Sequence, residues 1–363
     1  MHSETLSRYL ALKEQGHLIH ARDIAAEMGI SEAELAHCRA GYDACRLTRD
    51  IPAIFRMLGT AGELKSITRN DHAVHEHTGT YDNAEFGEHA CLLLNPYGLD
   101  LRFFLSQWQT VFAFAENTPR GLRHSLQFFD RHGDTVHKIY TTADTDMGVW
   151  HHLTAQFAAY DNPPVVPEPA VIPACTSLTP EQQAEFTRHW QQMTDVHQFF
   201  VLLKRFNISR LQAFRCVDNT LAQRVDNTLA QRVDNSALSR LLTQCTEEQN
   251  DIMIFVANRG CVQIFTGAIG RVEPYISPRD GQHWINIFNP SFTLHLIESA
   301  VAESWITRKP TKDGIVTSLE LFDKNGQAIA QLFGQRTEGE PEQTIWRSQI
   351  NALLTDCSGE AAA

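Results

Sequence analysis

The second half of this chain weakly repeats the first, and this repetition limits the folds that are open to it. The segment "RNDHAVHEHTG" (69–79) aligns with "NRGCVQIFTG" (258–267), which places Asn70 over Asn258 at the same offset as the Thr-Gly pairs that follow. Residues 94–136 then match residues 288–329 apart from a small indel; the paired positions include Asn95-Pro96 with Asn289-Pro290, Phe112 with Trp305, Gly121 with Gly314, and Asp130 with Asp323. Such self-similarity predicts two copies of one structural unit.

Within each copy the hydrophobic period changes along the chain. Residues 21–38 ("ARDIAAEMGISEAELAHC") and 180–193 ("PEQQAEFTRHWQQM") have helical spacing. Residues 125–140 ("SLQFFDRHGDTVHKIY") and 317–333 ("TSLELFDKNGQAIAQLF") alternate around a D-x-x-G turn and predict β-hairpins. Helices followed by antiparallel strands indicate an α+β fold, here duplicated.

The length of 363 residues also favours two domains. Residues 158–180 contain six of the 14 prolines, and such a segment forms a semi-rigid connection. We therefore expect an N-terminal repeat over 1–160, a proline-rich linker over 161–178 and a C-terminal repeat over 179–363.

Composition argues against several classes of protein. The net charge of −12 argues against general nucleic-acid binding, and no apolar run is long enough to span a membrane. The N-terminal residues show no signal-peptide pattern, so a cytoplasmic protein is expected. No CxxC pair occurs among the eight cysteines, which favours free, structural thiols: Cys38, Cys45, Cys91, Cys175, Cys216, Cys245, Cys261 and Cys357.

A finer repeat lies in the second half, where "VDNTLAQR" (217–224) recurs identically at 225–232 and then as "VDNSALSR" (233–240). Apolar residues four apart predict a tolerated duplication that lengthens a helix by about 12 Å per copy. A repeat-built binding surface would need more and longer units.

His197 is the main candidate for chemistry. The helix that leads to it should begin with Thr179 as N-cap, Pro180 in the first turn and Gln182 completing a capping box. Helical spacing then groups Phe186, Trp190, Met193, His197, Phe200 and Lys204 on one inward, apolar face. A second cap at Thr194 or Asp195 would restart the helix with His197 in its first turn.

Two interpretations of His197 stay open from the residues alone. A histidine on an apolar face is ordinarily a hydrogen-bonded core residue. Alternatively, an apolar slot with nearby aromatics and Lys204, Arg205 and Arg210 at its rim suits haem, which needs an axial imidazole, apolar walls and cations for its propionates.

The other motifs give weaker evidence for a functional site. His72, His75 and His77 in "HAVHEHTG" offer a metal site without further ligands in view, or else are solvated strand histidines. No GxSxG, P-loop or GxGxxG fingerprint is present, which argues against nucleophile hydrolases and nucleotide-binding proteins.

The motifs "MTDVHQFFVLLKR", "NPYGLDLRFFLSQW", "TRKPTKDG" and "AQLFGQRTEGEPEQ" resemble the cytoplasmic hemin-handling and hemin-degrading proteins of Gram-negative bacteria, the HemS/HmuS/ChuS family. The resemblance runs from "ARDIAAEMGISEAELAHCR" to "WRSQINALL", nearly the whole chain. It implies two tandem repeats, each a large antiparallel sheet with flanking helices, and haem b bound in the cleft between the halves.

By this resemblance His197 is the axial ligand of the haem iron, and Arg102 approaches the opposite face of the haem. Phe104 would pack near that face. The propionate and rim region would be formed by Arg210, Lys309, Gln331 and Arg336. Phe333 stands where the family commonly has tyrosine, and the 217–240 duplication is longer than the family pattern.

The resemblance implies a cytoplasmic protein of haem uptake and iron acquisition that degrades haem oxidatively and releases iron. Haem is then both ligand and substrate, His197 and Arg102 are the catalytic residues, and an external donor supplies electrons. The alternative is a haem chaperone or storage protein without chemistry of its own. Implied partners are hemin, the cytoplasmic side of a haem ABC importer and the electron donor; a homodimer is left open.

Overall fold

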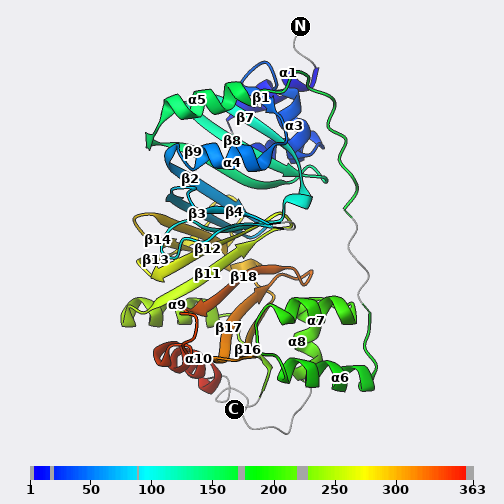
Figure 1. Ribbon diagram of the computed structural model, residues 1–363, viewed down its shortest axis with the longest axis vertical. Helices are drawn as coiled ribbons and strands as arrows, with labels where there is room; N and C mark the ends of the chain where they lie inside the picture. Colours follow the sequence, from blue (N-terminus) through cyan, green and yellow to red (C-terminus); the bar gives the residue numbers. More distant parts are fainter. Residues whose placement is uncertain (1–3, 17–19, 88–89, 171–175, 219–227, 357–363) are drawn as a thin grey trace. The chain divides into compact units, whose positions relative to one another are not determined.

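The computed structural model describes residues 4–16, 20–87, 90–170, 176–218 and 228–356 (Figure 1). The chain divides into two compact units. Unit 1 comprises Met1–Arg69, His75–Val171 and Ala257–Gln263, and unit 2 comprises Asn70–Val74, Ile172–Val256 and Ile264–Ala363.

The first repeat begins with helices and continues with strands. Its helices are α1 (Glu4–Gln15), α2 (Ala21–Met28), α3 (Glu32–Cys38), α4 (Ile51–Leu58) and α5 (Met147–Gln156), with a 3₁₀ turn η1 (Leu105–Gln107). Its strands are β1 (Ala44–Leu47), β2 (Gly62–Arg69), β3 (Ala73–Gly79), β4 (Ala84–Phe86), β5 (Cys91–Leu93), β6 (Asp100–Phe103), β7 (Trp108–Thr118), β8 (Gly121–Asp130) and β9 (Thr135–Thr145).

The second repeat has the same order of elements. Its helices are α6 (Pro180–Gln191), α7 (Gln198–Phe206), α8 (Arg210–Asp218), α9 (Ala237–Glu248) and α10 (Thr344–Asp356), with a 3₁₀ turn η3 (Glu298–Ala300). Its strands are β10 (Ala230–Val233), β11 (Asp251–Ala257), β12 (Cys261–Ala268), β13 (Arg271–Ile276), β14 (His283–Phe288), β15 (Phe292–Ile297), β16 (Glu303–Thr311), β17 (Gly314–Phe322) and β18 (Ala328–Gly334).

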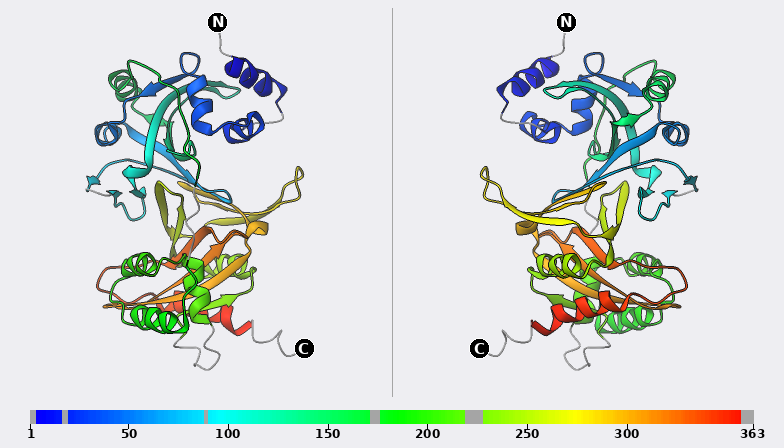
Figure 2. Two further views of the ribbon diagram at one scale, coloured as in Figure 1. Left: turned by 90° about the vertical axis from the view of Figure 1, so that its right-hand side faces the viewer. Right: turned by 90° about the vertical axis from the view of Figure 1, so that its left-hand side faces the viewer.

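The strand order confirms the duplicated α+β fold. The first repeat runs β1-β7-β8-β9-β2-β3 and the second β10-β16-β17-β18-β11-β12, so that each strand number differs from its counterpart by nine. Each repeat also has a smaller antiparallel set, β4-β5-β6 and β13-β14-β15. Figure 2 shows the β13–β14 hairpin projecting from the body of its unit.

The predicted hairpins form as β8–β9 and β17–β18. In each turn an aspartate side chain, Asp130 or Asp323, accepts two backbone N–H groups. The glycine of each D-x-x-G motif has positive φ, 81° at Gly133 and 76° at Gly326, which is why glycine is required there.

Asn70 and Asn258, aligned in the sequence, are placed in equivalent turns. Each carboxamide oxygen accepts two backbone N–H groups of its own turn. The Nδ2 of Asn70 donates to the Ile329 carbonyl, and that of Asn258 to the Val136 carbonyl, both at 2.8 Å. Each compact unit therefore includes a turn contributed by the other repeat.

In unit 2 the sheet is covered on both faces (Figure 1). Helices α9 and α10 pack on one face in a core that includes Leu238, Leu241, Leu319, Leu332, Trp346 and Ile350. Helices α6, α7 and α8 cover the other face through Trp190, Phe199, Phe214, Trp305 and Phe322. Of the candidate site residues of unit 2, this second set of helices carries His197 and Arg210, whereas Lys309, Gln331 and Phe333 belong to the strands.

The helical spacing of residues 21–38 is confirmed: they form α2 and α3, divided where Gly29 adopts φ 70° and Ser31 with Glu34 forms a new capping box. Another helix prediction needs correction. The helix predicted across the 217–240 repeat is wrong at Ala230–Val233, which forms β10 and pairs with β16. Residues 217–218 end α8, residues 237–240 begin α9, and residues 219–227 lie outside the described residues. Tertiary pairing overrides the local helical period at 230–233.

No helix within the described ranges is long and apolar enough to cross a membrane. Residues 161–170 contain neither helix nor strand, and the Glu168 backbone N donates to the Arg131 carbonyl of unit 1. The domain limits expected from the sequence stay a prediction.

Candidate functional site

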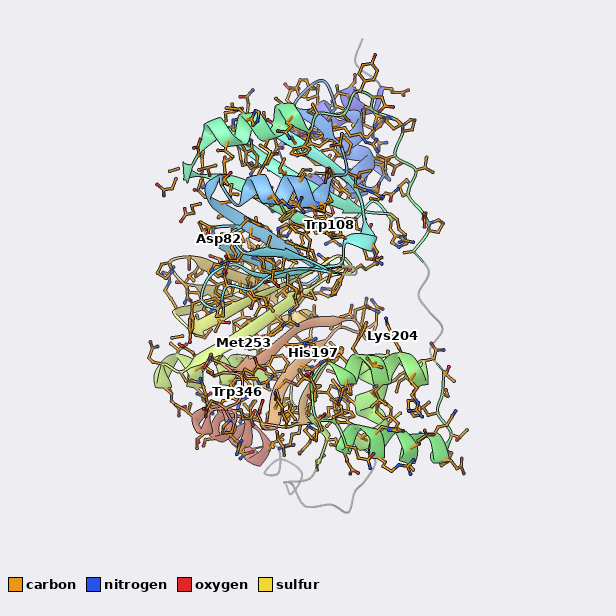
Figure 3. The ribbon with its side chains drawn as sticks, viewed as in Figure 1. Asp82, Trp108, His197, Lys204, Met253 and Trp346 are labelled. Atoms are coloured by element: carbon orange, nitrogen blue, oxygen red, sulfur yellow. The ribbon has the colours of Figure 1, made fainter. Side chains whose placement is uncertain are left out.

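His197 lies at the start of α7, where it is the N-cap residue (Figure 3). The preceding helix has the predicted cap: Thr179 accepts from the Gln182 backbone N, and Gln182 accepts from the Thr179 backbone N. That helix ends at Gln191, and a new helix begins at Gln198 with His197 as its N-cap; the predicted restart is confirmed, but the predicted cap at Thr194 or Asp195, with His197 in the first turn, is wrong. The Asp195 carboxylate accepts hydrogen bonds from both the backbone N and the Nδ1 of His197, each 2.7 Å long.

The predicted inward orientation of His197 is wrong. Its side chain is 73% exposed, whereas Trp190 and Met193 on the same projected face are buried. The break between α6 and α7 interrupts the helical count, so that α7 buries Phe199, Leu202 and Leu203 instead. Sequence spacing extended across the break therefore assigned the wrong face.

The Asp195 contact determines which nitrogen of His197 is available. A carboxylate can only accept, so Nδ1 carries the proton and donates it, and Nε2 keeps its lone pair. The hydrogen bond from the His197 backbone N, together with the ring hydrogen bond and the nearby Arg336, lowers the pKa of Asp195. An exposed imidazole with a free Nε2 lone pair is a competent metal ligand.

An exposed stripe on α7 continues from His197 through Phe200, Val201 and Lys204, at helical spacing of three and four. Phe200 is 60% and Val201 65% exposed. The Lys204 ammonium lies 4.6 Å from the centre of the Phe200 ring. This α7 surface combines a ligand nitrogen, an apolar patch and a cation.

Beside α7, a buried polar network brings together Arg210, Lys309 and Gln331, three of the predicted rim residues. Its centre is Glu320, which lies between Arg210 and Lys309 and is 1% exposed. Arg210 Nη2 donates to Glu320 at 2.8 Å and to Gln331 at 3.4 Å. Lys309 Nζ donates to Glu320 at 2.8 Å and to Thr307 at 2.6 Å.

Charge and burial act together in this network. Burial lowers the pKa of Lys309 to about 8, against the opposing charge of Glu320. Burial alone would raise the pKa of Glu320, but Arg210 and Lys309 hold it well below its usual range. Lys309 is only 3% exposed and is paired with Glu320, so its role is to stabilise the network inside the protein. Arg210 is the more accessible cation.

Phe333 lies beside Gln331 of this network, and Arg336 lies close to Asp195. Phe333 is on the same face of β18 as Gln331, half-buried, with its ring edge-on to Phe255 at 5.0 Å between centres. Arg336 follows β18 and is close enough to Asp195 to lower its pKa, after the hydrogen bond from His197. Their predicted roles toward propionates stay predictions.

Arg102 and Phe104 belong to unit 1. Arg102 is in β6 opposite Leu92, and its Nε is buried without a hydrogen-bond partner among the described residues. Burial raises the pKa of Asp100, two residues earlier on the same face, to about 6, with Arg102 opposing the shift. Phe104 is partly exposed. That Arg102 faces His197 across a ligand stays a prediction, because the two belong to different units.

Sequence reasoning missed Glu320 and a counterpart of His197 in the first repeat. His20 is the N-cap residue of α2, as His197 is of α7. Burial lowers the pKa of His20, and Arg69 and Lys138 lower it further. At the offset that relates Asp130 to Asp323, Lys138 corresponds to Gln331 and Tyr140 to Phe333. Extending the internal alignment at that offset would have found the pairs Lys138–Gln331 and Tyr140–Phe333, but neither Glu320 nor the relation of His20 to His197.

The histidines of β3 are not solvated. His75 and His77 are buried, and burial lowers the pKa of both, that of His77 to about 4. His72 contacts Asp323 at 3.3 Å. Among the residues that the structure describes, no group of three His, Cys, Asp or Glu side chains could hold a metal ion.

Comparison with known proteins agrees with the sequence resemblance. The model of a family described as a haemin-degrading HemS/ChuX domain matches residues 29–157 and 207–353. Hemin transport protein HmuS of Yersinia pestis is 52% identical over 354 residues, 98% of each chain.

Two solved structures are similar over nearly the full length. The heme degrading enzyme ChuS of Escherichia coli O157:H7 is 50% identical with a TM-score of 0.87, covering 96% of this chain and 98% of its own. The heme-binding protein PhuS of Pseudomonas aeruginosa, in its holo form, is 36% identical with a TM-score of 0.88, covering 97% and 99%.

Proposed function

The chain belongs to the haemin-degrading HemS/ChuX family, and we propose on that premise that it binds haem b through His197 and degrades it oxidatively, releasing iron. The named relatives support haem as the ligand: one is a hemin transport protein, one a heme degrading enzyme and one a heme-binding protein. Haem would then be both cofactor and substrate.

The observation that carries this proposal is the Asp195–His197 pair beside the α7 surface. It presents an exposed imidazole whose Nδ1 contacts Asp195, so that Nε2 is the ligand atom of the neutral ring, next to the exposed Phe200 and Val201. Haem needs one axial nitrogen and an apolar wall for its ring, and the α7 surface offers both. These residues therefore fit the ligand.

The propionates need cations, and unit 2 provides them. Arg210, Lys309 and Glu320 together carry one net positive charge, and Arg210 is the partly exposed member. Arg336 and Lys204 add charge near the two ends of the α7 surface. Arginine offers a planar fork that matches a carboxylate, which suits Arg336 to this role. Arg210 donates Nε and Nη2 to Glu320, so its Nη1 is the donor left for a propionate.

Arg102 is assigned to the opposite side of the ligand. Its guanidinium stays protonated under all working conditions, so it can donate hydrogen bonds but cannot act as a base. Its buried Nε, unpartnered among the described residues, is a donor for which the unit itself supplies no acceptor. Bound haem supplies the iron and the ring that is oxidised; Arg102 and His197 orient it from the two sides.

A hemin titration followed by reduction tests the enzyme proposal. Purified protein is titrated with hemin, and an electron donor is then added under air with catalase present. Loss of the Soret band with release of chelatable iron and a ring-opened product is the expected result. A stable ferrous or oxygenated spectrum would refute degradation.

A haem carrier is the second candidate. The 73% exposure of His197 favours it, because haem bound to an accessible axial histidine can be passed to a receiving protein. Transfer of haem to an apo-haemoprotein, faster than haem loss to buffer, would identify the carrier.

On the same premise we propose that the protein is cytoplasmic and that its partners are a haem importer, an electron donor and a second copy of the chain in a homodimer.

A further inference from the structure

The carboxylate of Asp195 makes two contacts with one residue. Its Oδ1 accepts from the backbone N of His197 and from Nδ1 of the same residue, at 2.7 Å each. The first contact orients the main chain at the start of α7, and the second orients the ring. Because χ1 and χ2 of the histidine are thereby restricted, Nε2 points in one direction.

The loop that holds Asp195 is anchored on several sides. The Thr194 carbonyl accepts from the Lys312 backbone N at 2.9 Å, which ties the loop to the β16–β17 turn. The Gln198 side chain bonds back to Thr194, accepting from its backbone N at 2.9 Å, and the Gln198 backbone N donates to the Asp195 carbonyl at 3.1 Å. Asp195 is thus presented by a fixed backbone rather than by a mobile loop.

Among the described residues, the counterpart histidine of the first repeat makes no such hydrogen bond, although the charge of Asp23 opposes the lowering of its pKa that burial causes. His20 is also an N-cap, but its side chain makes no capping hydrogen bond and the residue two positions earlier is Leu18 rather than aspartate. The carboxylate–histidine pair therefore distinguishes the second repeat from the first. His20 and His197 occupy equivalent positions in the two repeats, and the hydrogen bond to Asp195 distinguishes them.

We propose that Asp195 is a positioning residue for the iron ligand: it holds the His197 ring and, by accepting its Nδ1–H, makes Nε2 a stronger donor. The inference rests on the proposed haem binding. A ligand histidine that donates its second N–H to a carboxylate is fixed in tautomer and more basic, and loss of such a partner typically costs about 10- to 100-fold in metal affinity. Because Nε2 then donates its electron pair more strongly to the iron, the ferric state is favoured over the ferrous state.

Two variants separate orientation from charge. Asp195→Asn keeps an acceptor oxygen for both contacts but removes the negative charge, whereas Asp195→Ala removes both. Glu338→Gln is the control for charge, because Glu338 is an exposed residue of the same unit whose only described ion pair is a 3.8 Å contact with Lys312. Thermal unfolding should be alike in all three.

The readouts are the hemin dissociation rate, the ferric/ferrous midpoint potential and the iron–imidazole stretching frequency of the ferrous complex. Asp195→Asn should lower the stretching frequency and raise the potential while binding hemin nearly as tightly as wild type. Asp195→Ala should show the same shifts and release hemin about 10- to 100-fold faster. Glu338→Gln should match wild type.

The outcomes separate this inference from the function beneath it. If wild type shows no Soret change with hemin, or His197→Ala leaves the spectrum unchanged, haem ligation by His197 fails. If both behave as expected but the stretching frequency and potential of Asp195→Asn equal those of wild type, only the role of Asp195 is refuted.

Discussion

Replacing Glu320 by glutamine should destabilise unit 2 strongly and in a pH-dependent manner. Glu320 and Lys309 are 1% and 3% exposed, and removing one partner of a buried ion pair costs about 3–5 kcal/mol. We expect a loss of that size in the free energy of unfolding near pH 6. An exposed pair, represented by Glu338→Gln, should cost less than about 1 kcal/mol.

The pH dependence follows from Lys309. Burial lowers its pKa to about 8, below the unfolded value, so the unfolded chain binds more protons between these values and stability rises with pH. Loss of Glu320 removes the charge that opposes this lowering, and the pKa of Lys309 falls further. The difference in the free energy of unfolding between wild type and Glu320→Gln should therefore shrink as the pH rises from 6 toward 8.

On the acid side this difference should also shrink. The lowered pKa of Glu320 gives wild type a stabilisation that is present above the unfolded carboxyl pKa and lost as pH falls below it. Urea denaturation at pH 4, 6 and 8 measures the free energy of unfolding of wild type and variant at each pH. A double variant, Lys309→Met with Glu320→Gln, should recover most of the loss. A cost under about 1 kcal/mol at pH 6, or no recovery in the double variant, would refute the buried-pair argument.

The remaining predictions concern the ligand. His197→Ala should alter the hemin spectrum and weaken binding, whereas His189→Ala, a helix histidine paired with Glu185, should not; identical spectra for the two would contradict axial ligation. Arg102→Ala should leave stability and hemin capture nearly unchanged, because its buried Nε has no partner among the described residues, but lower turnover at least tenfold in single-turnover assays; equal losses in capture would contradict this. Phe333→Tyr should raise hemin affinity about 2- to 10-fold by isothermal titration, the worth of one hydrogen bond, and unchanged affinity would place the hydroxyl away from the propionates.

Local signals account for what could be predicted from the sequence. The two D-x-x-G hairpins form because an aspartate side chain and a positive-φ glycine define each turn within a few residues. The Thr179 capping box and the break between α6 and α7 are local in the same sense. The alignment paired Asn70 with Asn258, and the structure places both in equivalent turns, because one fold copied twice needs the same turn chemistry twice.

Function was also approached from sequence, but through resemblance. The motif around His197 indicated a haem ligand only after family motifs were considered, since helical spacing alone favoured a core histidine. The structure shows why spacing was insufficient: the helix breaks before His197, and the imidazole is exposed with its Nδ1 bound to Asp195.

Contacts between distant parts of the chain were decided only by the tertiary structure. Glu320 is adjacent in sequence to neither Arg210 nor Lys309, yet strand pairing and the position of α8 enclose all three in one buried network. Likewise, residues 230–233 have a helical period but form a strand, because β16 offers an edge whose backbone groups need partners. Hydrophobic period and turn residues act over a few positions and can be read along the chain, whereas burial, ion pairing and sheet order depend on what the fold places alongside.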